Sequence, residues 1–410
     1  MTLLKKAVQW VSRSFGVGVG DAGAWGEVRA RLGVGSFSGE TVTDESALQV
    51  ATAWACVRLL AETIATLPVG MYERTDAGGR RAAADHPLHS LVHDQPNADH
   101  TAVEFWEGAV TWLCLRGNAY AEILRVAGRI VALDLLPADQ VEPKRRADGA
   151  LYYRHTADGK VRDLAEEDVF HVRGFGAGGD VGLSPISYAR QTLGLSLAQT
   201  RAAAKIYASG LRPHGVVEGE TRLDKEQRKQ FRELLNEYAR RESAADAVRV
   251  LLLPPGFKFS PMSLSPEDAQ LLESQAFGVE EVCRWFRVPP AMIGHTEKQT
   301  SWGTGVEQQM IGFLTFSLRP YLVRIEQAIR RCLLKPVERS HYFARFSLDG
   351  LMRADSAGRA ALYSALAQNG VLTRNEIRAL EDREPLPGGD ELTVQVNLVP
   401  LERLGKVPAA

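Results

Sequence analysis

Apolar residues recur at helical spacing in several long segments of the chain. Residues 47–67 keep this period until Pro68 ends it. A second helix is predicted to begin at Thr101, because Glu104 follows three residues later as in a capping box. One face of this second helix carries Val103, Trp106, Val110 and Leu113. The ordered part of the chain, from about Asp44, is therefore predicted to open with helices.

The period then changes to two, which predicts strands. Short turns that contain Gly128 and Gly159 separate the strands of two hairpins. The alternating runs are residues 120–126, 130–136, 151–156, 160–164 and 168–173. This region is predicted to be a strand-rich meander, so the chain as a whole is expected to be of the α+β class.

Two long helices are predicted on either side of a small module. The first covers residues 186–209 and is rich in alanine, whose small side chain lets neighbouring helices approach closely. The second begins with Ser265 as N-cap and Pro266 at its first position. The module between them is predicted to be a strand, a helix and a strand, at residues 215–218, 224–241 and 248–253.

A polar loop at residues 294–305 leads into a third long helix, predicted over residues 306–334. Pro320 lies inside this helix, where it removes a backbone hydrogen bond and costs ~3 kcal/mol unless the helix bends. The chain then returns to shorter helices. One is predicted at residues 357–368, and the next is capped by Thr373 and Glu376 and ended by Pro385.

Composition narrows the class of protein. At 410 residues the chain is long for one compact core, and its formal net charge is only −1. That balance argues against a protein that wraps nucleic acid by neutralising many phosphates, but not against one that lets nucleic acid slide past. The four cysteines are far apart, so a disulfide framework or zinc site is not expected and a reducing compartment fits.

A nucleotide-binding enzyme is the first alternative, because Gly174, Gly176 and Gly179 match the dinucleotide fingerprint after a strand. The context is wrong, since residues 180–184 intervene before the helix that Pro185 begins. We interpret the segment as a flexible glycine loop. A phosphate-binding loop is also absent from the sequence, because both Gly-Lys pairs are followed by valine.

A metal-dependent enzyme is the second alternative. His86, His89 and His93 fall at helical offsets, but Pro87 between the first two indicates a turn. Nothing else in the sequence completes a ligand shell around them. We therefore predict no metal, no cofactor and no catalytic residues.

The predicted helix of the small module has two different faces. The basic face carries Lys225, Arg228, Lys229 and Arg232. The opposite face is apolar and carries Phe231, Leu234, Leu235 and Tyr238. A solvated basic face is the commoner situation, but on a small module between two long helices this surface is a candidate docking site.

The chain resembles the portal proteins of long-tailed phages, or of phage-derived gene-transfer particles, over about residues 47–389. Several separate blocks carry the resemblance through their order and spacing. They read AWACVRLLAETIATLP (53–68), HPLHSLVHDQPN (86–97), LRGNAYAEI (115–123), GLSPI (182–186), RVPPAMIG (287–294), VEQQMIGFLTFSLRPYLVRIEQ (306–327), LTRNEIR (372–378) and EPLPGGD (384–390). At residues 301–306 the chain departs from the family, in which asparagine often stands just before the Glu-Gln pair.

The resemblance implies the portal fold and names for its parts. These are a strand-rich wing (residues 44–182, completed by the kinked helix and strand of 306–348), two stem helices (183–212 and 265–290) and a small α/β clip (213–264). A tunnel loop would occupy 291–305. A helical crown would cover 349–388. A flexible N-terminal arm (1–43) would precede the wing, and a C-terminal tail (389–410) would follow the crown.

The resemblance also implies a function that is not enzymatic. Copies of the chain would form a ring, usually of twelve, at one capsid vertex of the virion, after assembly in the host cytoplasm. Double-stranded DNA would pass through the ring during packaging and ejection. The clip residues Lys225, Arg228, Lys229 and Arg232 would meet the terminase large subunit and the head–tail adaptor. Other expected partners are the major capsid protein and the scaffolding protein.

The tunnel loop is expected to line the narrowest part of the channel. Its one cation is Lys298, which we expect to touch DNA phosphates. Gln299, Thr300 and Ser301 offer hydrogen bonds without reading base sequence, and Trp302 follows them. One lysine from each subunit would form a belt of positive charge around the passing duplex.

Overall fold

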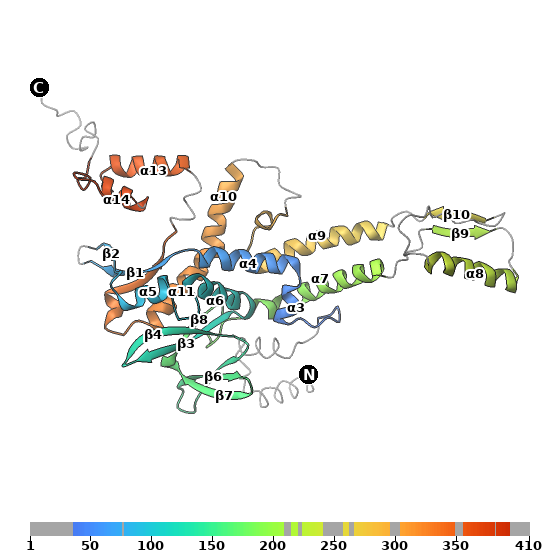
Figure 1. The fold of residues 1–410 in the computed structure, drawn as a ribbon, viewed down its shortest axis with the longest axis horizontal. Coiled ribbons are helices and arrows are strands. Elements are labelled where there is room, and N and C mark those ends of the chain that lie inside the picture. The colour runs from blue at the N-terminus through green and yellow to red at the C-terminus, as the bar shows by residue number, and fades with distance from the viewer. Residues whose placement is uncertain are drawn as a thin grey trace, which may run out of the picture.

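The computed structural model describes residues 36–75, 78–208, 215–219, 224–240, 257–261, 266–295, 304–348, 356–381 and 383–393. A body of helices and small sheets continues into a pair of long helices that lead to a separate module (Figure 1). No helix in the described part of the chain is long and apolar enough to cross a membrane. The predicted arm at residues 1–43 lies outside the described residues up to residue 35.

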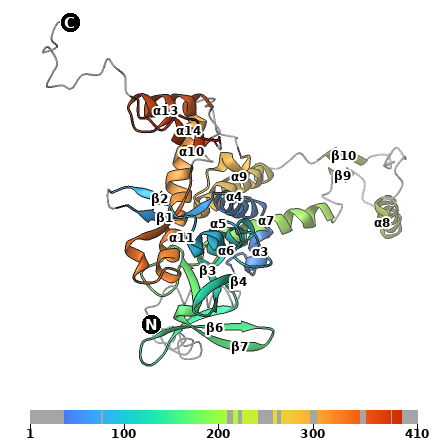
Figure 2. The ribbon, with the colours of Figure 1, turned by 60° about the vertical axis from the view of Figure 1, so that its left-hand side comes forward.

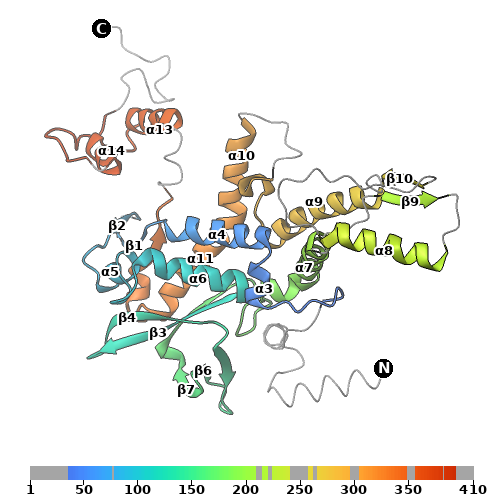
Figure 3. The same cartoon turned by 45° about the vertical axis from the view of Figure 1, so that its right-hand side comes forward.

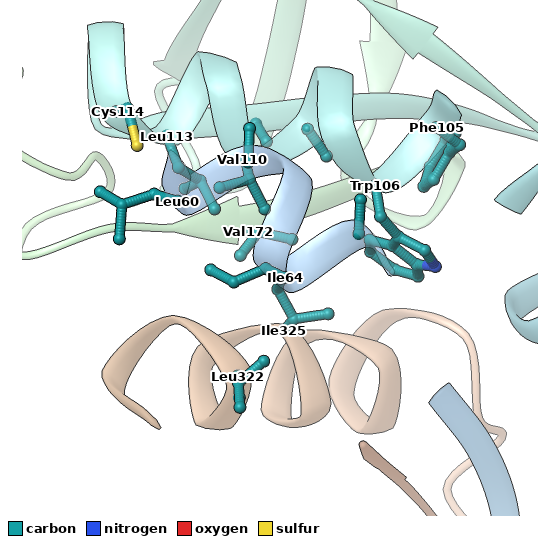
Figure 4. Close-up of a cluster of buried hydrophobic side chains, with 14 of the residues drawn as sticks. Leu60, Ile64, Phe105, Trp106, Val110, Leu113, Cys114, Val172, Leu322 and Ile325 are labelled. Atoms are coloured by element: carbon teal, nitrogen blue, oxygen red, sulfur yellow. The ribbon is translucent and has the colours of Figure 1, made fainter. Parts of the chain in front are cut away.

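The helices α4 (Ala51–Ala65), α6 (Ala102–Arg116) and α11 (Arg319–Cys332) enclose the main core. Figure 4 shows Ile64 of α4 and Ile325 of α11 facing each other in this core, below Val110 of α6. Both isoleucines are fully buried. Truncating such a side chain to alanine costs about 2–5 kcal/mol, so this contact between distant segments is a major part of the body's stability.

The capping box predicted for α6 is confirmed. The hydroxyl of Thr101 accepts from the backbone N–H of Glu104, whose carboxylate accepts from the backbone N–H of Thr101 at 2.7 Å. The helix ends at Gly117, which has the left-handed φ of 71°. The shorter helix α3 (Asp44–Leu48) has its own capping box ahead of α4.

Two three-stranded antiparallel sheets form the predicted meander, and the second lies below the first in Figure 2. The first has the order β4-β3-β8, from β3 (Asn118–Val126), β4 (Arg129–Leu136) and β8 (Val169–Arg173). The second has the order β5-β6-β7, from β5 (Val141–Arg145), β6 (Leu151–Ala157) and β7 (Lys160–Ala165).

Both predicted hairpin turns are confirmed, with positive φ at both central residues. The φ angles are 50° and 77° at Ala127 and Gly128, and 51° and 73° at Asp158 and Gly159. This geometry matches the twist of the flanking strands.

A third sheet was not predicted: β1 (Val69–Arg74) pairs with β2 (Arg80–Ala82) and with β11 (Tyr342–Phe346).

One expectation about the histidine segment is wrong. Residues 87–93 form a helix, α5 (Pro87–His93), where Pro87 indicated a turn. Pro87 is the first residue of that helix, a position at which a missing N–H costs nothing and the fixed φ of proline is suitable. His86 is the N-cap, and its ring nitrogen accepts from the backbone N–H of Leu88.

The two predicted long helices are α7 (Pro185–Ala208) and α9 (Pro266–Phe286), and they pack side by side. The module beyond them contains β9 (Gly215–Gly219), α8 (Lys225–Arg240) and β10 (Phe257–Pro261), with β9 and β10 antiparallel. The strand predicted at residues 248–253 lies entirely outside the described residues. Within the described residues, the strand that pairs with β9 is β10.

The third long helix is interrupted where the sequence predicted a kink. It consists of α10 (Thr304–Gly312), a π-helical segment η3 (Phe313–Leu318) and α11. Pro320 is the second residue of α11. In an unbroken α-helix its ring would clash with the carbonyl group four residues earlier, and the wider π turn removes that clash. A short helix η2 (Pro290–Ile293) precedes this region.

Two helices end the described chain, α13 (Ser356–Gln368) and α14 (Arg374–Leu380), and they lie apart from the strands in Figure 3. The capping box of α14 is confirmed, because Thr373 and Glu376 bond each other's backbone N–H groups. The amide of Asn375 then bonds the backbone N–H and C=O of Leu386, so the Pro-rich segment after α14 folds back onto it.

Candidate functional site

The basic face predicted on the small module lies on α8. Lys225, Arg228, Lys229 and Arg232 are all exposed to solvent there. Asp224 begins the helix, because its carboxylate accepts from the backbone N–H of Gln227 at 2.8 Å. Each of the four cations lies three or four residues from two of the others, so they occupy one side of the helix. The structure thus brings this set of predicted residues together on one accessible surface.

The predicted channel residues Lys298, Gln299, Thr300, Ser301 and Trp302 lie outside the described residues. The segments on both sides are described. The helix η2 ends at Gly294, which has a φ of 85°, and α10 starts at Thr304. In Figure 1, α10 rises away from the strands of the body, with its first residues at the far end.

A joint of three glycines, Gly117, Gly174 and Gly182, connects the strands to the long helices. The backbone N–H of Gly174 donates to the carbonyl of Gly117 at 2.8 Å. A Cβ on Gly182 would lie 2.1 Å from that same carbonyl oxygen, so no larger residue fits without moving the backbone. Gly117 and Gly182 belong to two of the sequence blocks that carried the resemblance, and the fold brings them into contact.

Asn118 satisfies the buried polar groups at this joint. Its side-chain oxygen accepts from the backbone N–H of Gly182 at 2.7 Å and from Nε2 of His171 at 3.0 Å. Its side-chain nitrogen donates to the carbonyl oxygens of Arg116 and Gly182. Because an amide oxygen cannot donate, Nε2 of His171 carries the proton, and Nδ1 accepts from the hydroxyl of Tyr153 at 3.0 Å.

His171 is held neutral by this environment. Burial, reinforced by the positive charges of Arg173 and Arg331, lowers the pKa of His171 well below its ordinary value. Burial also raises the pKa of Tyr153 to about 12, so this hydroxyl stays protonated and donates. The network joins the two sheets to the start of α7. We did not predict it from sequence, although Asn118 stands in the block LRGNAYAEI.

The start of α7 is fixed to the body in a second way. The hydroxyl of Ser184 donates to the carbonyl of Leu115 at 2.9 Å, and it accepts from the backbone N–H of Ser187 inside α7. The end of α9 is tied to the π-helical segment, because the hydroxyl of Ser317 donates to the carbonyl oxygen of Arg287. Both long helices are therefore anchored at the same end, next to the body.

The glycine loop lacks the geometry of a dinucleotide site. Helix α7 begins at Pro185, six residues after Gly179, so no helix N-terminus opens at the third glycine. Gly174 and Gly182 are instead used for close backbone packing at the joint.

The three histidines each have a structural contact. His89 Nδ1 accepts from the backbone N–H of Met71, and His93 Nδ1 lies 3.2 Å from the carbonyl oxygen of Val69. His86 caps α5. Within the described part of the chain, no three His, Cys, Asp or Glu side chains are grouped to hold a metal ion.

Comparison with known proteins agrees with this architecture. A family profile described as "Phage portal protein" matches residues 51–382. The portal protein of Enterobacteria phage HK97 is 37% identical over 375 residues, covering 90% of this chain and 87% of that protein. The probable portal protein of Streptomyces phage phiC31 is 38% identical over 384 residues, covering 90% and 82% respectively.

Solved structures show the same fold. A chain in the neck of an empty gene transfer agent particle, computed with C6 symmetry, is 25% identical with a TM-score of 0.61, covering 84% of this chain and 94% of that one. An HK97-family phage portal protein from Corynebacterium diphtheriae is 18% identical with a TM-score of 0.51, covering 77% and 99%. With the profile match over most of its length, this α+β chain belongs to the phage portal protein family.

Proposed function

We propose that copies of this portal protein form a closed ring, of twelve subunits, at one vertex of a capsid. The ring would surround the channel through which double-stranded DNA enters during packaging and leaves during ejection. Its role is structural, not catalytic. The protein would assemble in the host cytoplasm and remain in the virion. The chain in the gene transfer agent neck supports a ring, because that neck was computed with C6 symmetry, with which twelve copies are compatible.

An apolar stripe on the two long helices carries the proposal of a ring. Tyr188, Thr192 and Leu195 follow one another at spacings of four and three on α7, so they share a face. Trp285 of α9 joins this face, because its indole N–H donates to the hydroxyl of Thr192 at 3.2 Å. Tyr188, Leu195 and Trp285 are 44%, 52% and 43% exposed, which is typical of a surface that a partner covers.

A second exposed apolar region lies on a different element. Met310 and Ile311 of α10 and Phe316 of the π-helical segment are all exposed. A ring needs two different, complementary surfaces on each subunit, because each copy contacts its two neighbours in a head-to-tail manner. Two separate apolar surfaces on α7–α9 and on α10 supply what such an interface requires.

The parts of the fold then take the roles implied by the resemblance. The sheets around β3 and β6 would form the wing, α7 and α9 the stem, the module with α8 the clip, and α13 and α14 the crown. The exposed cations of α8 would meet the terminase large subunit and later the head–tail adaptor. The loop at residues 294–305 would face the DNA, with Lys298 nearest its phosphates. Major capsid and scaffolding proteins would contact the outside of the ring.

Native mass spectrometry of the purified protein tests the ring. We expect the wild-type protein as twelve-subunit rings, and Leu195→Glu as smaller species, because it buries a charge in the interface. Val161→Glu is the matched control: Val161 is 58% exposed on β7, away from the long helices, and the variant should form rings. A wild-type protein that stays monomeric at all concentrations would contradict the proposal.

A further inference from the structure

A cleft of about 1010 Å³ lies between the end of α11 and the two sheets of the body. One wall is the turn after α11, around Lys335 and Arg339, and the other comes from strands β4, β6 and β7. In Figures 1 and 2 these elements lie on the side of the body opposite α10. None of the four predicted docking residues on α8, all of which the structure describes, lines it.

The cleft has an apolar floor. The apolar side chains come from α5, β4, β6, β8 and the segment after α11. They include Leu88, Ile130, Leu151, Val169, Leu333 and Leu334. Its size is at the upper end of ligand pockets, which is enough for several side chains of a peptide but not for a folded domain.

Two arginines of the wall are held in place without being neutralised. The guanidinium of Arg331 donates to the carbonyl oxygen of His171 at 2.9 Å. Arg339 donates to the carbonyl oxygens of Leu334 at 3.1 Å and Arg331 at 2.7 Å. A carbonyl oxygen fixes the orientation of a guanidinium, but it carries no net charge. These contacts therefore keep two positive charges at fixed positions beside the floor.

The lining as a whole has a surplus of positive charge. Six cations stand against three carboxylates, those of Glu166, Glu167 and Glu338. The cations are Arg125, Arg129, Arg146, Arg331, Lys335 and Arg339. Among the described residues only Arg125 of this set forms an ion pair, with Asp168 at 2.9 Å. Arg129 and Lys335 are exposed at the rim, where they can reach a bound molecule.

We infer that this cleft binds an acidic peptide segment of a partner protein, with carboxylates at the cationic rim and apolar side chains on the floor. Bidentate contacts between guanidinium and carboxylate groups are among the strongest polar contacts in proteins. Duplex DNA fits less well, because its outer surface offers phosphates but no apolar groups for the floor. Residues 1–35 of this chain do not fit either, since their five Lys and Arg exceed their two Asp and Glu.

A labelled twelve-residue peptide of alternating glutamate and leucine is the probe, and fluorescence anisotropy with the assembled protein measures its binding. The double variant Arg129→Glu/Lys335→Glu should weaken binding about tenfold or more, because attraction at the rim becomes repulsion. Both residues are exposed, so the variant is expected to fold. Arg58→Glu/Arg319→Glu is the control, with the same change in net charge on two exposed arginines outside the cleft, and it should bind the peptide as the wild type does.

Three results would overturn the inference. Equal weakening in the two double variants would mean that only the net charge of the protein matters. Equal binding of a lysine–leucine peptide would mean that the carboxylates are not recognised. Displacement of the peptide by duplex DNA at the same concentration of negative charge would make the cleft a general anion surface. By contrast, weaker binding of the glutamate–leucine peptide to an Ile130→Ser variant would support the role of the apolar floor.

Discussion

The guanidinium of Arg324 donates a hydrogen bond to the carbonyl oxygen of Gly174 at 2.6 Å. Arg324 lies on α11 and Gly174 directly follows β8, so the contact joins the central helix of the body to the glycine joint. The same joint holds the start of α7 through Gly182 and Asn118. In a ring, these contacts would add to the apolar packing of α7 and α9 against the body.

Replacing Arg324 with alanine should lower the free energy of unfolding by about 1–3 kcal/mol, because a half-buried carbonyl loses a charged donor. Chemical denaturation measures the effect. Arg319→Ala is the control, since Arg319 is exposed on the same helix and its loss should change little. Equal stability of Arg324→Ala and Arg319→Ala would show that the contact with Gly174 contributes nothing.

Gly182→Ala should be more damaging, at about 3 kcal/mol or more, because its Cβ would collide with the carbonyl oxygen of Gly117. Thermal unfolding and the yield of soluble protein are the measurements. Gly312→Ala is the matched control: a Cβ there meets nothing within 4 Å, and alanine favours a helix. A Gly182→Ala protein that melts with the wild type would refute the close backbone packing.

His171 should make the protein sensitive to acid. Its pKa in the folded protein lies well below the ordinary 6.5, so below about pH 6.5 the unfolded chain takes up a proton that the folded protein does not. The contribution of neutral His171 to the free energy of unfolding is therefore fully present above pH 6.5. It falls by up to about 1.4 kcal/mol per pH unit as the pH decreases toward the folded-state pKa. Burial also lowers the pKa values of His86 and His89, which adds a smaller common decline.

The variant His171→Gln isolates this effect, because glutamine can donate to Asn118 without titrating. Unfolding free energies at pH 7.5 and 5.5 should differ less in the variant than in the wild type. Parallel pH dependences for the two proteins would show that His171 is not the source.

Charge reversal on α8 tests the docking surface. Arg228→Glu/Arg232→Glu should weaken binding of the terminase large subunit, and the binding that remains should depend less on salt, while rings still form. Biolayer interferometry at two salt concentrations would measure this, with native mass spectrometry as the check on assembly. The double variant Arg58→Glu/Arg284→Glu, on the body and on α9, is the control, because it changes the net charge of the protein by the same amount. Unchanged binding after reversal on α8 would place the contact elsewhere.

Lys298→Glu tests the channel loop. Replacing attraction with repulsion should shorten the DNA protected from nuclease in a packaging reaction, whereas Lys298→Ala should have a smaller effect. Rings and motor binding should be unaffected by either change. Wild-type lengths of protected DNA with Lys298→Glu would mean that this loop does not grip DNA.

Local features of the fold could be predicted because they depend on neighbouring residues. The capping boxes at Thr101 and Thr373 and the turns at Gly128 and Gly159 are all confirmed. Each rests on hydrogen bonds or φ angles within four residues, which the sequence specifies directly. The basic face of α8 follows from helical periodicity for the same reason.

Contacts between distant segments could not be predicted in this way. The pairing of β1 with β11, the approach of Gly117 to Gly182 and the cleft beside Arg339 join parts of the chain whose separation carries no local signal. Pro87 itself indicated a turn but is the first residue of α5, since proline suits both a turn and a helix start and its local preferences do not separate the two. The sequence by itself determined the long helices, the strands of the meander, their caps and turns and, through its ordered blocks, the portal family. Only the tertiary structure decided the joint, the network around His171 and the cationic cleft, since the free energy that orders them comes from burial shared among remote segments.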